Sequence, residues 1–186
     1  MKMSKGLMLF MACLGLVGVT GAVITSSSPN IMDNVVLAQT RSVSCYDTLT
    51  VSGIQELQDV NAATYTEWDY GKYHGQTART TGNAIQMRST KPSGIVALTT
   101  PGNVRKIVVE WNDGTANGRT IDIYGKNEEY TSPEDLYAAS TQGTKIGSIV
   151  CGTSTELTIN DNYAYFGIRS NKSALYLDSL TIYCSK

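Results

Sequence analysis

Short runs of alternating apolar and polar residues recur along the chain from Cys45 to Cys184, and this spacing constrains the fold more than any other feature. Clusters of Gly, Asn, Asp, Ser and Pro separate the runs at intervals of about ten residues. Because successive side chains of a strand point to opposite faces, a period of two predicts strands with one apolar face. We therefore predict an all-β fold, an antiparallel two-sheet β-sandwich.

The alternation also assigns residues to the two faces of each predicted strand. In the run VRKIVVEW, Ile107, Val109 and Trp111 share the side that we expect to face the core. In RTIDIYG, Ile121 and Ile123 point inward for the same reason. The remaining runs are CYDTLTV, NAIQMRS, GIVALTT, KIGSIVC, STELTI, AYFGIRS and ALYLDSLTIYC.

One segment departs from this pattern and is predicted to form a short helix. It is SPEDLYAAS, residues 132–140. Ser132 is a suitable N-cap and Pro133 is tolerated in the first turn. The acidic residues Glu134 and Asp135 would lie near the positive end of the helix dipole.

Two phrases of the sequence resemble each other closely, AIQMRSTKPSGIV at residues 84–96 and YFGIRSNKSALYL at residues 165–177. Each passes from alternating apolar residues into Arg-Ser, then a Lys within a small polar turn, then a second apolar run. We interpret each phrase as a β-hairpin, in which Arg88 or Arg169 leaves the core just before the turn. The side chains expected to point inward are those of Ile85, Met87, Phe166 and Ile168. The repetition then reflects the scaffold and not a repeated catalytic site.

The N-terminal segment has the features of an export signal. Lys2 and Lys5 precede the uncharged run GLMLFMACLGLVGVTGAVI, and cleavage is plausible after Ala22 or Ala38, of which we favour Ala38. An uncleaved membrane anchor is the alternative, because the run is nearly long enough to span a bilayer. The predicted organisation is a signal peptide or anchor with its tail at residues 1–38, a linker at 39–44 and the β-sandwich module at 45–186. We expect the module to be secreted or exposed at the cell surface, and a membrane to be involved only if the segment stays uncleaved.

An exported protein can keep disulfides, and three cysteines follow the signal segment. Cys45 begins the first predicted strand and Cys184 closes the last. Terminal strands of sandwiches often lie side by side, so we predict a Cys45–Cys184 bridge, worth about 5 kcal/mol in the chain-entropy model. Cys151 is then a buried free thiol. The alternative is that no bridge forms.

The charge balance and the missing motifs exclude several partners. The chain has 15 basic and 16 acidic residues, with no cluster of Lys and Arg of the kind that nucleic-acid binding requires. The phosphate-binding glycine motifs of nucleotide and dinucleotide sites are missing, so no cofactor is expected. The cysteines are too far apart for a zinc site, and NDGTANG at 112–118 fails the spacing of a calcium loop and predicts a hairpin turn. We therefore expect no metal.

Catalytic residues are also poorly represented. The single histidine, His74, lies in DYGKYHGQT, which we interpret as an exposed loop, and no nucleophile motif accompanies it. Glu110 and Asp122 could face one surface from neighbouring strands, as the two carboxylates of a glycoside hydrolase must. Acids on wet sheet faces are common, so we predict that the protein is not an enzyme.

The candidates for ligand binding are aromatic and polar residues expected to face solvent. Exposed rings suit the apolar C–H faces of sugars, and Arg and Gln suit the hydroxyl rim. The predicted ligand-binding residues are Tyr70, Tyr73, Gln86, Arg88, Tyr124 and Arg169. Tyr65 and Trp68 are expected to cover an edge of the core instead.

The combined phrases of residues 45–184 resemble a known class of module. The phrases are SGIVALTT, VRKIVVEWND, GRTIDIYGKNEEYTSPEDLYAASTQGTKIGSIVCGTSTELTI and YAYFGIRSNKSALYLDSLTIY. They look like the β-sandwich modules appended to secreted proteins of Bacteroidota and some Firmicutes, often beside hydrolases. The resemblance implies a jelly-roll or galactose-binding-like sandwich with a role in binding glycans or surfaces, and it supplies no catalytic residue.

We therefore expect an exported, non-catalytic binding module, with carbohydrate or a surface glycan as its ligand. A structural or protein-interaction domain of the cell envelope is the alternative. A small glycoside hydrolase that uses Glu110 and Asp122 is a third, less favoured reading.

Overall fold

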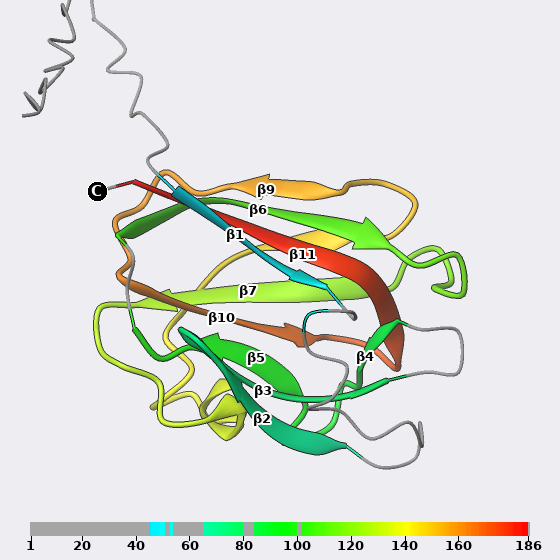
Figure 1. The fold of residues 1–186 in the computed structure, drawn as a ribbon, viewed down its shortest axis with the longest axis horizontal. Coiled ribbons are helices and arrows are strands. Elements are labelled where there is room, and N and C mark those ends of the chain that lie inside the picture. The colour runs from blue at the N-terminus through cyan, green and yellow to red at the C-terminus, as the bar shows by residue number, and fades with distance from the viewer. Residues whose placement is uncertain (1–44, 51–52, 54–64, 80–83, 100–101, 186) are drawn as a thin grey trace, which may run out of the picture. The chain divides into compact units, whose positions relative to one another are not determined.

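Strands of three to eleven residues make up most of the described chain, and all of their pairings are antiparallel. A computed structural model describes residues 45–50, 53, 65–79, 84–99 and 102–185, which belong to one unit spanning residues 39–186 (Figure 1). The strands are β1 (Cys45–Thr50), β2 (Thr66–Tyr70), β3 (Tyr73–Arg79), β4 (Ile85–Met87), β5 (Gly94–Ala97), β6 (Asn103–Trp111), β7 (Thr120–Lys126), β8 (Thr144–Val150), β9 (Glu156–Thr158), β10 (Tyr165–Ser170) and β11 (Leu175–Ser185). The predicted all-β fold is confirmed.

Hydrogen bonds join the strands into one continuous sheet in the order β8-β7-β10-β5-β3-β4-β11-β6-β9, with β1 paired to β11 and β2 paired to β3. The two ends of this path, β8 and β9, come together without pairing. Leu157 of β9 packs on Gly147 of β8, where an added Cβ would lie 3.0 Å from the Leu157 side chain. The sheet is therefore nearly closed into a barrel.

One hydrophobic core fills the space inside this curled sheet. We call β2, β3, β5, β7, β8 and β10 the β10 half, and β1, β4, β6, β9 and β11 the β11 half. Ile107 and Val109 of the β11 half share a core with Ile121 and Ile123 of the β10 half. Each is at most 2% exposed, and full burial of such a side chain stabilises the fold by about 1.5–3 kcal/mol. The inward faces predicted for these runs are confirmed.

The two similar phrases are not hairpins, and that prediction is wrong. β4 pairs with β3 and β11, whereas β5 pairs with β3 and β10. Likewise β10 pairs with β5 and β7, whereas β11 pairs with β1, β4 and β6. Each phrase is thus an arch, whose turn carries the chain from one half of the sheet to the other. Alternation could not distinguish an arch from a hairpin, because both have two strands of period two around a polar turn.

The two arches pair with each other through a local two-fold relation. The strand before one turn pairs with the strand after the other, β4 with β11 and β5 with β10. The matching registers are Gln86↔Tyr176 and Met87↔Leu175 in the first pair, and Gly167↔Val96 and Ile168↔Ile95 in the second. Aligned on Arg88 and Arg169, the strands before the two turns match residue for residue, whereas the strands after them match with a shift of one residue, because the first turn is one residue longer. The turns also touch, since the Ser173 amide donates to Ser89 Oγ at 3.1 Å.

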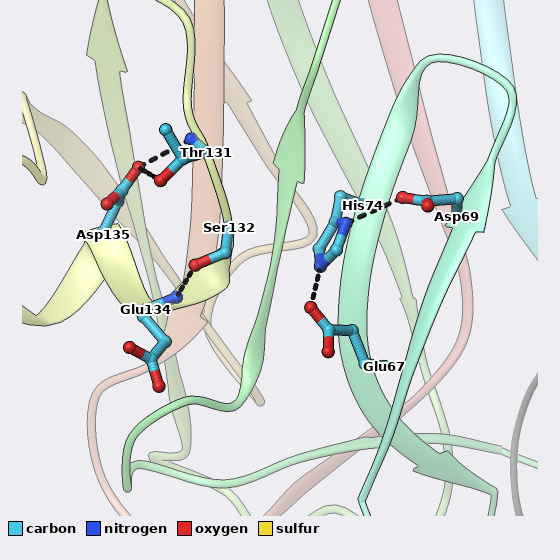
Figure 2. A network of polar contacts seen from close by, with 7 residues as sticks. All are labelled: Glu67, Asp69, His74, Thr131, Ser132, Glu134 and Asp135. Carbon is cyan, nitrogen blue, oxygen red and sulfur yellow. Dashed lines mark hydrogen bonds and ion pairs between the residues drawn. The ribbon is translucent and has the colours of Figure 1, made fainter.

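The predicted helix is a 3-10 turn, η2 (Pro133–Tyr137), that covers the outer face of the β10 half. Ser132 caps it as predicted, with its Oγ accepting from the Glu134 amide at 3.2 Å (Figure 2). Asp135 Oδ2 accepts from the amide and the hydroxyl of Thr131. These bonds fix the turn so that Leu136 is fully buried against the sheet.

Two glycines make room for this cover. An added Cβ at Gly167 would lie 2.4 Å from Leu136, and one at Gly94 would lie 3.0 Å from it. Leu136 forms a second small core with Val96, Tyr124 and Tyr130. Tyr124 is therefore 4% exposed although it lies on the outer face, where we predicted it to meet solvent.

Of the two cysteine predictions, the one for Cys151 is confirmed and the one for a Cys45–Cys184 bridge stays a prediction. Cys151 is a free, buried thiol, as predicted, and burial raises the pKa of that thiol above its usual value. The register of β1 and β11 places Cys45 directly opposite Cys184. No disulfide is recorded among the side chains that the structure describes, and that of Cys45 lies outside them, so the bridge stays a prediction.

The predicted signal segment and linker, residues 1–44, lie outside the described residues. Among the residues that are described, no helix has the length and apolar character needed to cross a membrane.

Candidate functional site

Four of the six predicted ligand-binding residues belong to one group of side chains where the two arches meet. They are Gln86, Arg88, Tyr124 and Arg169, and three further tyrosines accompany them, Tyr65, Tyr137 and Tyr176. We call these seven residues the Arg–Tyr cluster. β4, β7, β10 and β11 contribute to it, η2 supplies Tyr137, and Tyr65 immediately precedes β2.

Arg169 lies across two aromatic rings. Its Cζ atom is 4.7 Å from the ring centre of Tyr137 and 5.5 Å from that of Tyr124. One of its terminal nitrogens donates to the Tyr124 hydroxyl at 3.0 Å. Contacts of a guanidinium with a ring face contribute about 0.5–2 kcal/mol each, more where water is excluded. The rings therefore hold the guanidinium in place.

Arg88 repeats this arrangement on the other arch. Its Cζ atom lies 4.6 Å from the ring centre of Tyr65. The turn that follows it is fixed by Tyr137, whose hydroxyl donates to the carbonyls of Ser93 at 2.7 Å and Thr90 at 3.0 Å. Tyr137 thus connects both arches, because its hydroxyl binds the first and its ring supports Arg169 of the second.

Buried polar atoms without a hydrogen-bond partner are concentrated in the Arg–Tyr cluster. Among the described residues there are four such side-chain atoms, and three of them are Arg169 Nε, Gln86 Oε1 and the Tyr65 hydroxyl. Most buried polar atoms of folded proteins are paired, and an unpaired one costs about 1–3 kcal/mol. Their gathering in one place distinguishes this cluster from the rest of the described structure.

Two tyrosine hydroxyls of the cluster, those of Tyr65 and Tyr137, stay protonated at neutral pH. Burial raises the pKa of Tyr65 and of Tyr137 to about 12 each, although the neighbouring Arg88 and Arg169 lower them in part. The hydroxyls therefore act as neutral donors and acceptors, and they add no negative charge beside the arginines.

The carboxylate closest to Arg169 in the sheet register is occupied by other partners. Asp122 lies opposite Arg169 on β7. Its oxygens contact Lys145 Nζ at 2.8 Å, Ser148 Oγ at 2.7 Å and Asn171 Nδ2 at 2.9 Å. Within the described part of the chain, Arg169 forms no ion pair.

Tyr70 and Tyr73 do not join this cluster. Tyr73, predicted to be exposed, is 3% exposed, and its hydroxyl donates to Asp47 Oδ2 at 2.8 Å. It lies at the start of β3, whereas the cluster adjoins Ala78 near the end of that strand. Tyr70 is 43% exposed, as predicted. The two tyrosines line a separate open pocket of about 250 Å³ with Asp47, Thr48, Leu49, Gly71 and Lys72.

His74 is not in an exposed loop, contrary to our prediction. It lies on β3, where β2 and β3 form a hairpin closed by Gly71 and Lys72. Figure 2 shows its ring held between two acids of β2, with Nδ1 2.7 Å from Asp69 Oδ1 and Nε2 2.9 Å from Glu67 Oε1. The second approach has the length of an ion pair without the angle of a hydrogen bond. Since both ring nitrogens contact carboxylates, neither is available to activate a nucleophile.

Glu110 and Asp122 do not face one surface, so the predicted carboxylate pair is wrong. β6 and β7 are not neighbours in the sheet, and they belong to different halves. Their inward residues meet in the same core, so their outward residues point away from each other. Glu110 is exposed and accepts a hydrogen bond from Ser179 Oγ at 3.1 Å.

The two tryptophans are structural, as predicted. Trp68 is 4% exposed and covers Gly75, and its Nε1 donates to Thr77 Oγ1 at 2.9 Å. Trp111 packs against the core and donates to the Ser154 carbonyl.

Sequence reasoning missed Tyr137 and Tyr176 as members of the cluster. Tyr137 was assigned to a helix with no role, and only the contact of η2 with both arches reveals its position. Tyr176 was missed because its place opposite Gln86 depends on the pairing of β4 with β11, which the sequence pattern does not give.

No group of three or more His, Cys, Asp or Glu side chains in the described structure is arranged to hold a metal ion. No model of a known protein family matches the sequence, and a search of curated proteins finds no significant relative.

Proposed function

We propose that this chain is an exported, non-catalytic module that binds carbohydrate, such as a surface glycan, through the Arg–Tyr cluster. The fold that we propose is a two-sheet β-sandwich of the jelly-roll or galactose-binding-like type, closed by a Cys45–Cys184 bridge. The single core between the β10 half and the β11 half supports two layers. The register of Cys45 with Cys184 supports the bridge.

One observation carries the proposal of carbohydrate binding. Two arginines related by the local two-fold each lie on tyrosine rings, beside the buried Tyr65 hydroxyl and Gln86 Oε1, which have no hydrogen-bond partner in the described structure. Sugars present alternating C–H faces and hydroxyls, which this mixture of ring faces, fixed cations and neutral hydroxyls matches. Both arginines are partly exposed, so a ligand can reach them from solvent.

A glycan array tests the proposal. We expect the parent chain to bind at least one glycan class, and an Arg88→Ala, Arg169→Ala double variant to lose at least tenfold in affinity. The matched control, Lys72→Ala with Lys106→Ala, removes the same formal charge outside the cluster and should bind as the parent does. A control that loses binding equally would instead indicate the pocket beside Tyr70 or a general effect of charge.

A structural or protein-interaction domain of the cell envelope is the second candidate. Tyr46, on the outer face of β1, is 68% exposed and stacks with Tyr183 at 5.9 Å between ring centres, which suits a protein contact. The absence of glycan binding by the parent chain would favour this candidate.

A small glycoside hydrolase is the third and least supported candidate, because Glu110 and Asp122 point away from each other. This candidate would gain support if the chain hydrolysed any member of a polysaccharide panel and if Glu110→Gln or Asp122→Asn abolished that hydrolysis.

A further inference from the structure

The ligand class of the Arg–Tyr cluster follows from the hydrogen bonds that Arg169 lacks. A guanidinium has five N–H donors, and proteins that bury one usually satisfy most of them. Arg169 donates to the Tyr124 hydroxyl and also interacts with the Tyr137 hydroxyl, while its buried Nε has no hydrogen-bond partner. Its other contacts are the faces of the same two tyrosine rings.

The positive charge of Arg169 is also unneutralised within the described part of the chain. Asp122, its register partner, is bound to Lys145, Ser148 and Asn171. Tyr137, whose ring lies under the guanidinium, adds no negative charge, because burial raises the pKa of its hydroxyl to about 12. A half-buried cation with no anion beside it costs free energy that a bound anion would recover.

The planar fork of an arginine matches a carboxylate better than a hydroxyl, because two parallel N–H donors can meet two oxygens of one group. Tyr124 is buried beneath the guanidinium, but Tyr65, Tyr137 and Tyr176 of the cluster are partly exposed, and their rings can present apolar surface to a sugar. A sugar that carries a carboxylate would therefore satisfy both parts of the cluster at once.

We propose that the Arg–Tyr cluster binds an acidic sugar, with the carboxylate of a uronic or sialic acid residue held by Arg169 and the sugar ring against the neighbouring tyrosines. This inference rests on the proposed carbohydrate binding and narrows it to one class of ligand. Arg88, the two-fold mate of Arg169, lies on the same cluster and adds a second positive charge.

The test compares probes that differ only in the carboxylate. Titration calorimetry with the full chain uses tri-galacturonic acid against its methyl ester, and sialyllactose against the methyl ester of its sialic acid residue, in 50 mM NaCl. We expect at least one acid to bind about tenfold more tightly than its neutral counterpart, and the difference to shrink in 500 mM NaCl because salt screens partly exposed charges. The pair that shows the preference distinguishes a uronic acid from a sialic acid.

Variants assign the preference to a residue. Arg169→Gln should abolish the preference for the acid while binding of the neutral probe persists, and Arg169→Lys should restore it only in part because an ammonium lacks the fork. Lys106→Gln, which removes one charge outside the cluster, should keep the preference. Thermal unfolding of each variant shows whether it is folded.

The outcomes separate this inference from the function on which it rests. Equal affinity of the parent for acid and neutral probes, or a preference that survives Arg169→Gln, would overturn the acidic ligand and leave carbohydrate binding standing. Absence of binding to every probe and to the whole glycan array would remove both.

Discussion

Arg105 of β6 lies beside the end of β11 and Arg169 of β10 lies near its beginning, and the hydrogen bonding of the two arginines differs. At the end of the strand, Arg105 donates from Nε to Ser185 Oγ, and from its two terminal nitrogens to the Asp161 carbonyl and Asn162 Oδ1. At its beginning, where the arches meet, Arg169 donates to the Tyr124 hydroxyl and lies on tyrosine rings. All three nitrogens of Arg105 are used, whereas Nε of Arg169 is buried without a partner.

The comparison shows that this chain can provide an acceptor oxygen for every nitrogen of a guanidinium, as it does for Arg105. Loop oxygens and β11 itself surround Arg105, so its donors are satisfied within the chain. The same chain surrounds Arg169 with rings instead of oxygens. We therefore infer that Arg105 stabilises the fold and that Arg169 is kept for a ligand.

The largest expected effect concerns the closed end of β11. Cys184 precedes Ser185, the partner of Arg105, and lies opposite Cys45. Directly opposed residues of antiparallel strands have Cα atoms about 4.5–5.5 Å apart, within the range of a disulfide. Reduction should lower the free energy of unfolding by up to about 5 kcal/mol, measured by urea unfolding with and without a reducing agent.

Peptide mapping without reduction should find Cys45 joined to Cys184 and Cys151 free. A Cys151→Ser variant serves as the control, since it should keep the response to reduction. Recovery of Cys45 and Cys184 as free thiols from oxidising conditions would contradict the bridge.

The next effect is the loss of Arg105. Arg105→Met removes three hydrogen bonds from a charged donor, and we expect the free energy of unfolding to fall by about 3 kcal/mol. Chemical denaturation at constant m-value measures it. Arg105→Lys should recover only part of the loss, because an ammonium cannot reach three separated acceptors. A fall in the free energy of unfolding of less than about 1 kcal/mol would mean that Arg105 is not the stabilising arginine that we infer it to be.

Tyr137→Phe should have an intermediate effect. It removes the hydroxyl that donates to Ser93 and Thr90, and leaves the ring under Arg169. We expect a loss of about 1–2 kcal/mol in the free energy of unfolding, with glycan affinity reduced less than by Arg169→Gln. Tyr163→Phe, on a half-buried ring outside the cluster, is the control. Equal losses in the two variants would show that Tyr137 has no special role in joining the arches.

The smallest expected effect on stability is that of Arg169 itself. Arg169→Met replaces a poorly paired cation by an apolar side chain of similar length, so we expect stability to change by no more than about 0.5 kcal/mol, while the preference for the acidic glycan is lost. Denaturation and calorimetry on the same variant separate the two quantities. A loss of stability as large as that of Arg105→Met would mean that Arg169 is structural.

The periodicity of the sequence was enough to predict most of the strands and their inward faces, because burial imposes alternation on each strand by itself, but β2 and β3 were interpreted as a loop. Ile107, Ile121, Phe166 and Ile168 are all in the core as predicted. The same periodicity does not predict which strands pair with each other. Whether Arg88 precedes a hairpin or an arch depends on which strands lie beside β4 and β5, and these come from distant parts of the chain.

The outward faces were predicted less well for the same reason. Tyr124 and Gln86 alternate as exposed residues do, yet they are 4% and 5% exposed. Tyr124 is covered by η2, an element with no strand periodicity whose position depends on Leu136 fitting over Gly94 and Gly167. Tyr73 faces the interior because the tight turn at Gly71 makes a hairpin where we had expected a loop.

The antiparallel pairing of β1 with β11 has a consequence for how the module would be displayed. Cys45 and Cys184 lie side by side, so the chain enters and leaves the sheet at one pole, while Tyr176 stands about 25 Å away along β11. A molecule tethered through the residues before Cys45 would hold its arginines at the far pole, facing outward from whatever surface carries it. A force applied to the module at Cys45 or at Cys184 would then not have to pass through the site.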